Sequence, residues 1–357
     1  MWKKVEYEKK DINKAGEKII DPNMTPDERA NCLRIIDNWR AAHAFPTNTF
    51  AIHLKHCVQD IPSAVVVQRL KRRDTIVQKL ERFPTMKLHR MQDLGGCRVI
   101  LPKVADVYDL VKQMRSSRIR HEESNYKDYI AIPNPNTGYR GYHLIYKYLS
   151  DRNTDYNGLK VEIQIRTKLQ HIWATAVETV GVFTDNKLKF NSGSEDWLKF
   201  FKLTSGLFAI EERTAIPDGL PTDAMEIFDQ WLVLLEKLDV ISTLGTIGIA
   251  TQKIGHIKKR AKKQQGYYII KLRFDPVDVE IEPFYGKEKR LEAATQAYSE
   301  LESLKQISKF DCVLVSAQSY ETLVDAYPNY FLDVKQFLRE VSYLLKTYSN
   351  LKGRTQG

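Results

Sequence analysis

Apolar and polar residues alternate from position 161 to 167, a pattern that predicts a β-strand with one apolar and one polar face. The apolar set is Val161, Ile163 and Ile165, and the polar set is Glu162, Gln164 and Arg166. Successive side chains of an extended chain point to opposite sides, so each set shares a face. The polar face either lines a polar cleft or is the solvated side of an edge strand, and the strand alone is compatible with both.

A turn-rich segment, residues 126–143, precedes this strand. Its Asn-Thr-Gly triplet favours a turn, because glycine adopts the positive φ that other residues avoid. Tyr139 follows directly, and Lys127, Arg140 and His143 lie nearby in the sequence. We interpret the segment as a loop whose aromatic ring stacks on a base while the cations hold phosphates. A hairpin loop whose tyrosines cover the sheet edge is the alternative.

Helical spacing and helix-end signals predict the elements around these motifs. Residues 1–24 are a polar segment, and Thr25 is expected to cap a helix that ends near residue 44. A break over residues 45–49 and a second helix to about residue 58 follow. Further helices are predicted at 74–82, with Asp74 as the cap, and at 104–116, 197–212 and 222–238.

Basic residues gather around a predicted strand-to-helix turn. The five cations are Arg69, Lys71, Arg72, Arg73 and Lys79. Strand alternation over residues 65–71 places Arg69 and Lys71 on one face. Cations at such a turn suit the phosphates of a nucleoside triphosphate. The alternative interpretation is a solvated basic helix face.

Two carboxylates stand at or near predicted strands. Asp93 comes just before an apolar strand at 97–101, and Glu162 lies on the strand described above. Carboxylates from two different elements can share a divalent cation, and oxygen ligands are those that magnesium prefers. Asp93 also fits the simpler role of a cap or turn residue.

The chain changes character at residue 266. Strands are predicted at 267–274, 277–281 and 311–316, with a helix over 287–305 and a last amphipathic helix through Phe337. We interpret residues 266–357 as a small α+β module without catalytic residues of its own. Residues 216–265 are predicted to form a helical connector.

Composition narrows the class of protein. The 357 residues include 55 Lys and Arg against 45 Asp and Glu, a net charge of +10 that favours polyanionic partners such as RNA or nucleotides. The four cysteines are far apart, which argues against a zinc site or a disulfide framework. An apolar signal core and an apolar run of about 18 residues are both lacking, so we expect a cytoplasmic protein without a membrane span.

Taken together, these motifs resemble the synthetase domain of the RelA/SpoT family. The resemblance is carried by Arg69-x-Lys71, Asp93 before Arg98-Val99-Ile100, Lys127-Asp128-Tyr129-Ile130, Gly138-Tyr139-Arg140-x-x-His143 and Glu162-x-Gln164-Ile165-Arg166-Thr167. It covers roughly residues 30 to 210. It implies an α+β fold in which a mixed, nucleotidyltransferase-like sheet is flanked by helices, with this domain at 25–215.

The resemblance also implies a reaction and roles for individual residues. Such relatives move the β,γ-pyrophosphate of ATP onto a ribose 3′-hydroxyl. Asp93 and Glu162 would hold Mg²⁺, and Glu162 would act as the base. The ATP and phosphate ligands would be Arg69, Lys71, Lys79 and Arg98. The acceptor ligands would be Tyr139, Lys127, His143, Gln164 and Arg166.

Some positions are more similar to the toxic small alarmone synthetases, in particular the CapRel group of fused toxin-antitoxins. Arg72 and Gly141 stand where alarmone synthetases usually carry serine, and the motifs around Asn38-Trp39-Arg40 and residues 169–176 match the toxic type. This resemblance implies transfer to the 3′-CCA end of tRNA, which stops translation. GTP or GDP as acceptor is the alternative, and an inactive RNA-binding or phage-sensing module is a second one.

The same resemblance gives the C-terminal module a role. In CapRel-like proteins this module is a tethered antitoxin, and a Tyr-x-x-Tyr segment blocks the ATP site until a phage protein binds. Tyr327 and Tyr330 match that segment. Tethering makes such a contact intramolecular, so even a weak one can inhibit. The alternative is a turn whose tyrosines fill the core of the small module.

Overall fold

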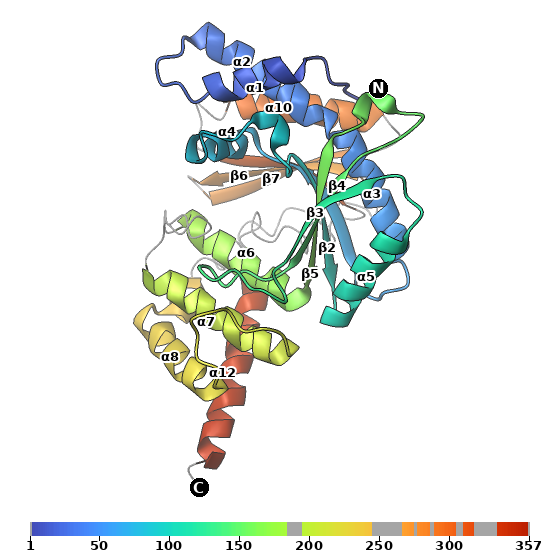
Figure 1. Cartoon of the computed structure of the whole chain (residues 1–357). Helices are drawn as coiled ribbons and strands as arrows, with labels where there is room; N and C mark the ends of the chain where they lie inside the picture. Colours follow the sequence, from blue (N-terminus) through green and yellow to red (C-terminus); the bar gives the residue numbers. More distant parts are fainter. Residues whose placement is uncertain are drawn as a thin grey trace.

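A mixed β-sheet organises the protein and confirms the predicted α+β class. The computed structural model describes residues 2–183, 195–244, 266–274, 277–285, 289–304, 310–317 and 334–355. Within these residues eight strands form one sheet in the order β3-β4-β5-β2-β1-β8-β6-β7 (Figure 1). The strands are β1 (Val65–Leu70), β2 (Gly95–Leu101), β3 (Glu122–Asp128), β4 (Tyr142–Lys147), β5 (Lys160–Thr167), β6 (Gly266–Phe274), β7 (Val277–Tyr285) and β8 (Phe310–Ala317).

The register of the strands gathers polar side chains on one face of the sheet. β2 and β5 are parallel, and β4 is antiparallel to β5. Glu162 is level with Gly96 of β2, whereas Gln164 lies between Arg98 of β2 and His143 of β4. Because residues in register point to the same side, the polar face predicted for β5 continues onto both neighbouring strands.

The opposite face of the sheet packs on the N-terminal helices. These are α1 (Lys9–Lys18), α2 (Pro26–Ala42), α3 (Ala44–Cys57), α4 (Arg73–Arg82) and α5 (Val104–Ser116). Val161, Ile163 and Ile165 are completely buried in this core, as the alternation predicted. Figure 1 shows α3 and α5 covering this side of the strands.

A second group of helices covers the polar side of the sheet beside the site. It consists of α6 (Lys168–Phe183), α7 (Glu195–Glu212), α8 (Ala224–Lys237) and the C-terminal α12 (Lys335–Thr355). Phe337 of α12 packs on Phe201 of α7 at 5.7 Å between ring centroids, and Tyr348 stacks on Phe228 of α8 at 5.1 Å. The end of the chain therefore returns to the layer of helices that flanks the polar face.

Two details near the N-terminus correct the expected pattern. The capping box at Thr25 is present, but α2 ends at Ala42 and α3 begins at Ala44, so the predicted break at 45–49 is helical. Pro46 is tolerated there because the N–H groups of the first helical turn have no partner within the helix. Residues 9–18 of the polar N-terminal segment form a helix whose Ile12 is completely buried.

A third detail concerns the start of α4. The helix begins at Arg73 with Arg72 in the N-cap position, and the side chain of Arg72 makes no capping hydrogen bond. Asp74 was expected to be the cap, but it is the second residue of the helix. A carboxylate in the first turn still interacts favourably with the helix dipole.

The C-terminal strands extend the same sheet. β8 pairs with β1, placing Val315 beside Arg69, and α10 (Lys289–Leu304) packs on β6 and β8. The division of the chain at residue 265 stays a prediction, and Tyr327 and Tyr330 lie outside the described residues. None of the helices in the described ranges has the length and apolar character needed to cross a membrane.

Candidate active site

Five side chains on the polar face form a closed ring of hydrogen bonds. Glu162 Oε1 lies 3.1 Å from His143 Nδ1, and His143 Nε2 lies 2.6 Å from the hydroxyl of Tyr139. Arg166 donates to that hydroxyl at 3.0 Å and to Gln164 Oε1 at 2.9 Å. Gln164 Nε2 donates back to Glu162 Oε2 at 2.8 Å. All five were predicted as site residues, and the fold brings them into one network.

The ring carries both charges of an ion pair. Burial by itself would lower the pKa of His143, but Tyr139 and Glu162 outweigh it and raise this pKa to about 9. Burial would raise the pKa of Glu162, and the neighbouring His143 keeps it below its ordinary value instead. At neutral pH we therefore expect an imidazolium and a carboxylate, held together by charge and hydrogen bonding.

Asp93 lies just before β2 and binds two lysines. Lys71 Nζ is 2.8 Å from Oδ2, and Lys79 Nζ is 2.9 Å from Oδ1. Burial would raise the pKa of Asp93, but the two ammonium groups overcome this effect and hold the pKa at about 2. The two lysines predicted to serve ATP thus converge on the carboxylate predicted to hold the metal.

A small polar recess joins the two halves of the site. It is lined by Arg69, Asp93, Gly96, Cys97, Arg98, Glu162 and Gln164. The carboxylates of Asp93 and Glu162 therefore face the same space, although they come from different elements. Gly96 is the residue of β2 that stands level with Glu162, and its lack of a side chain leaves room above the strand.

The donor set of this recess fits magnesium. Two carboxylates are the usual protein contribution where substrate phosphates and water complete the octahedron. Both carboxylates are held by groups of this chain, Asp93 by Lys71 and Lys79, and Glu162 by His143. Within the described residues no cluster of three or more His, Cys, Asp or Glu is arranged to hold a metal ion. A metal here would therefore depend on ligands from the substrate.

An aromatic cavity of about 280 Å³ adjoins the ring on its other side. Its walls include Tyr129, Tyr139, Trp173 and Phe201, with His143 and Arg166 from the ring. Ligand pockets are mostly apolar, with a few polar groups that orient the ligand, and this cavity lies at the small end of their range. Tyr139 takes part in both features, with its ring in the wall of the cavity and its hydroxyl in the hydrogen-bonded ring.

The remaining predicted acceptor ligand, Lys127, is exposed on β3. It stands in register with His143, so its side chain is on the polar face, and its Nζ lies 5.8 Å from the centroid of Tyr129. The prediction that Lys127 belongs to the acceptor side is thus compatible with its position at the edge of the cavity wall.

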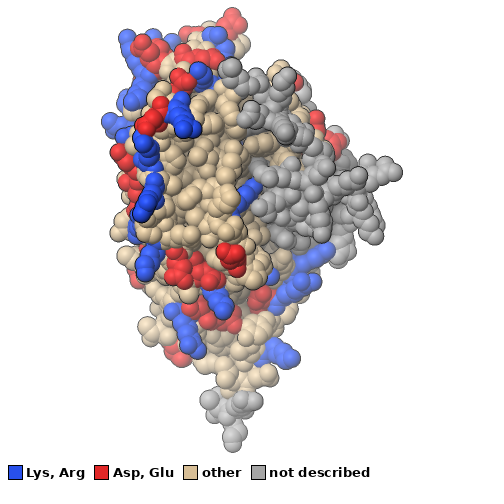
Figure 2. Space-filling view, turned by 90° about the vertical axis from the view of Figure 1, so that its right-hand side faces the viewer, with Lys and Arg blue, Asp and Glu red and all other residues tan. Residues whose placement is uncertain are grey.

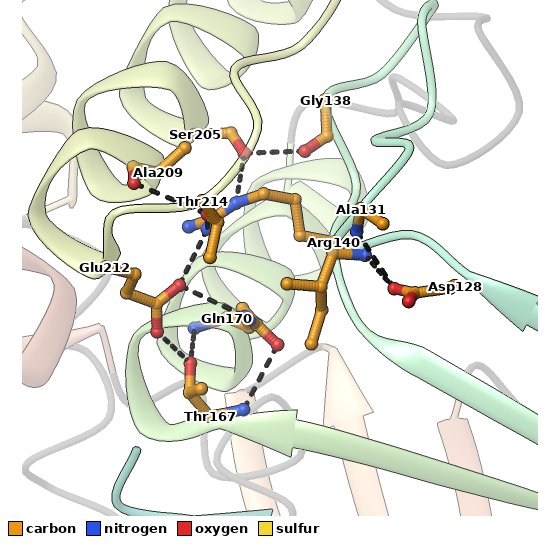
Figure 3. A network of polar contacts seen from close by, with 11 residues as sticks. Asp128, Ala131, Gly138, Arg140, Thr167, Gln170, Ser205, Ala209, Glu212 and Thr214 are labelled. Carbon is orange, nitrogen blue, oxygen red and sulfur yellow. Dashed lines mark hydrogen bonds and ion pairs between the residues drawn. The ribbon is translucent and has the colours of Figure 1, made fainter. Parts of the chain in front are cut away.

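Two of the cations that the sequence suggested for phosphates are used elsewhere. Arg140 is buried and pairs with Glu212, with 2.7 Å between Nη1 and Oε2 (Figure 3). Arg73 is buried too, and its side chain contacts Asp37 and the carbonyl of Glu302. Both arginines stabilise the structure around the site rather than facing a ligand, a correction to the expected basic clusters.

The loop before β4 depends on two glycines. Gly138 has φ of +75°, as the turn prediction required, and its carbonyl accepts a hydrogen bond from Ser205. Gly141 has φ of +154°, and an added Cβ would lie 2.9 Å from the hydroxyl of Tyr139. Gly141 therefore lets Tyr139 approach the sheet and join the ring.

Sequence reasoning missed several residues of the site. Tyr129 and Trp173 were noted only as parts of motifs, and Asn134 and Glu178 also line the cavity. Glu212 had no local signal at all, because it lies at the end of α7, far in sequence from the residues that it contacts.

Residues 68–183 match the family model described as "Region found in RelA / SpoT proteins". These residues contain the second half of β1, the strands and loops of the ring, and α6. The match confirms the predicted RelA/SpoT resemblance for this part of the chain.

Two curated relatives are GTP pyrophosphokinases of Bacillus subtilis (strain 168). YjbM is 34% identical over 116 residues, which are 32% of this chain and 54% of that protein. YwaC is 35% identical over 116 residues, 30% of this chain and 52% of that protein. The chain thus spans about half the length of the curated relatives that it matches.

Among solved structures, the chain is similar to small alarmone synthetase 1 from Bacillus subtilis bound to its product pppGpp. The identity is 26% and the TM-score is 0.38, and the likeness covers 47% of this chain and 87% of that one.

Proposed function

We propose that this protein transfers the β,γ-pyrophosphate of ATP to a ribose 3′-hydroxyl. The observation that carries the proposal is the shared recess of Asp93 and Glu162, flanked by Lys71 and Lys79 on one side and by an aromatic cavity on the other. Phosphate chemistry needs cations and carboxylates together, and a nucleoside needs aromatic walls. The pyrophosphokinase relatives support the same reaction.

In the proposed reaction the 3′-oxygen of the acceptor attacks the β-phosphorus of ATP. The new bond joins this oxygen to the β-phosphorus. The bond between the β-phosphorus and the oxygen that it shares with the α-phosphorus breaks, and AMP leaves with that oxygen. Glu162 accepts the hydroxyl proton, because its lowered pKa keeps it ionised. His143 holds that carboxylate in place from the far side. Positioning and charge neutralisation supply most of the acceleration.

Asp93 and Glu162 would hold Mg²⁺, which when bound neutralises charge on the phosphates. Lys71 and Lys79 bind Asp93 in this structure. We expect both lysines to turn to phosphate oxygens when ATP and the metal enter, since a divalent ion on Asp93 removes the need for two ammonium partners. Arg69 and Arg98 line the same recess and belong to the ATP side.

For the acceptor we propose the 3′-CCA end of tRNA, which would make the protein an inhibitor of translation. The positive net charge supports a nucleic-acid substrate. On the face seen in Figure 2, however, Lys and Arg residues stand among Asp and Glu residues around a broad uncharged area. A guanosine nucleotide is the second candidate, supported by the GTP pyrophosphokinase relatives.

We further propose that the C-terminal part inhibits the enzyme until a phage protein binds it. Support comes from β8, which lies directly beside β1 and so beside Arg69 of the ATP side. A ligand that binds only the released form would shift the balance toward activity. Replacing Tyr327 and Tyr330 together by alanine in the full chain should raise transferase activity, and unchanged activity would contradict their inhibitory role.

The test of the reaction uses the full chain and this double variant, incubated with ATP labelled at the γ-phosphate and with GTP, GDP and bulk tRNA together. Label on tRNA supports the tRNA proposal. Label on guanosine nucleotides alone would show that the protein acts as an alarmone synthetase. Glu162→Gln should abolish transfer, whereas Glu122→Gln, a change of an exposed glutamate on β3, should not. Absence of label on any acceptor would favour the inactive RNA-binding or phage-sensing module.

A further inference from the structure

Glu212 ends α7 and contacts the loop before β4, the end of β5 and the start of α6 (Figure 3). Its Oε2 accepts hydrogen bonds from Arg140 Nη1 at 2.7 Å and from Gln170 Nε2 at 3.1 Å. Its Oε1 accepts a short hydrogen bond from the hydroxyl of Thr167. The side chain is only 9% exposed, so these contacts are made largely away from water.

Two of the three partners of Glu212 are the immediate neighbours of site residues. Arg140 follows Tyr139 in the loop, and Thr167 follows Arg166 at the end of β5. Tyr139 and Arg166 are joined by the 3.0 Å hydrogen bond that closes the ring on the acceptor side. Glu212 therefore links the two chain segments that must stay together for this bond to form.

Further hydrogen bonds tie the loop that carries Tyr139 to α7 and the residues after it. Ser205 of α7 accepts from Arg140 Nε at 3.2 Å and donates to the carbonyl of Gly138 at 2.6 Å. Thr214 accepts a further hydrogen bond from Arg140 at 3.0 Å. The loop is thus tied to α7 on both sides of Tyr139, and the buried guanidinium of Arg140 has its charge compensated by Glu212 alone among these partners.

We propose that Glu212 is a positioning residue for the acceptor. It sets the position of the loop that carries Tyr139 relative to the strand end that carries Arg166, and with it the shape of the aromatic cavity. The contacts of Glu212 are with Arg140, Thr167 and Gln170, and Asp93 with its two lysines lies outside this network. Loss of Glu212 should therefore weaken binding of the acceptor and leave binding of ATP unchanged. This inference rests on the proposed transfer reaction.

The test compares Glu212→Gln with Glu211→Gln in the full chain. Glu211 is the preceding residue of α7 and interacts with Tyr343 of α12, away from the loop, so it is a matched control. For Glu212→Gln we expect the KM of the acceptor to rise roughly tenfold or more, since small displacements of binding groups are costly. The KM of ATP should stay within about twofold, and Glu211→Gln should change neither constant.

A second variant guards against simple unfolding, because Glu212→Gln leaves Arg140 buried without a counter-charge. Thr167→Val removes only the hydroxyl contact with Glu212 and should raise the KM of the acceptor to a smaller extent. Circular dichroism and a thermal melt show whether each variant is folded at the assay temperature. A joint rise of both KM values, or an unchanged acceptor KM in both folded variants, would overturn the role of Glu212.

Direct binding separates this inference from the proposed function. GDP and a short RNA ending in CCA serve as probes in calorimetry, with ATP and Mg²⁺ as the reference ligand. Binding of a probe by the parent chain, weakened at least severalfold by Glu212→Gln with ATP binding retained, supports positioning even where transfer is slow. If the parent and the variant bind the probe equally well, the positioning role of Glu212 is refuted, whereas the proposed reaction is not. A full chain with Tyr327 and Tyr330 replaced by alanine that binds neither probe and transfers no label refutes both proposals.

Discussion

Arg40 and Glu302 form an ion pair of 2.5 Å between Nη1 and Oε2, with 1% and 0% of their side chains exposed. The other carboxylate oxygen of Glu302 accepts hydrogen bonds from the backbone N–H of Arg73 at 3.0 Å and from the hydroxyl of Tyr298 at 2.8 Å. One carboxylate of α10 thus joins α2 and α4. Because α4 also carries Lys79, this contact links the C-terminal part of the chain to the helix that reaches Asp93.

Replacing Glu302 by glutamine should strongly destabilise the protein. The change removes the fully buried carboxylate partner of Arg40 and leaves its guanidinium with Asp37, 3.1 Å away and partly exposed. Breaking a buried pair in this way lowers the free energy of unfolding by up to about 3–5 kcal/mol. Urea denaturation of the full chain measures the difference. Asp229→Asn is the control, because its pair with Lys352 is about half exposed and is expected to contribute at most about 1 kcal/mol. Similar small losses in both variants would contradict the role assigned to Glu302.

Replacing Gly141 by serine should displace Tyr139 from the ring. The added Cβ would lie 2.9 Å from the tyrosine hydroxyl, so this hydroxyl must shift from the position in which it bonds to His143 and Arg166. We expect the acceptor KM to rise roughly tenfold, as for other displaced binding groups.

Gly158→Ser is the matched control for this change. Gly158 also has a positive φ, of +89°, but its added Cβ meets nothing within 4 Å. Both variants therefore carry backbone strain, and only Gly141→Ser carries the steric contact. Equal acceptor KM values in the two variants would show that strain, not the contact with Tyr139, is responsible.

The stabilisation by Asp93 should disappear in acid. Its pKa is about 2 in the folded chain and 3.8 ordinarily, so the stabilisation is fully present above about pH 4 and is lost as the pH falls toward 2. A shift of this size corresponds to on the order of 2 kcal/mol. Asp93→Asn should abolish transfer, and its difference in unfolding free energy from the parent should shrink between pH 4 and pH 2. A difference that stays constant over this range would show that Asp93 is not paired as described.

His143 should titrate far above an ordinary histidine. With a pKa of about 9, its contribution to stability is fully present below pH 6.5 and is lost as the pH rises through 9. NMR titration of the metal-free chain should give this midpoint, and Glu162→Gln should lower it. His121, whose pKa is lowered by burial, provides an internal reference that titrates below 6.5. A midpoint for His143 near that of His121 would rule out the pair of an imidazolium at His143 and a carboxylate at Glu162.

The alternation from Val161 to Thr167 was enough to predict β5, its buried face and its polar face, because side-chain direction in a strand depends only on local geometry. The turn at Gly138 followed from the preference of glycine for positive φ. Prediction was less accurate where two helices meet, as at His43, since the local signals of Pro46 and its polar neighbours fit both a break and a first helical turn.

By itself, therefore, the sequence determined most strands and helices and the set of polar residues that share the face of the sheet. It did not give β3, whose residues 126–128 were expected in the loop. Only the tertiary structure decided which of the polar residues meet. Arg140 and Arg73 are similar in sequence context to Arg69 and Lys71, yet Arg140 is buried against Glu212 and Arg73 is buried against Asp37, and both act as structural cations. These carboxylates lie 72 and 36 residues away along the chain. A local pattern contains no information on such distant partners, and burial of a charge is possible only where one is present.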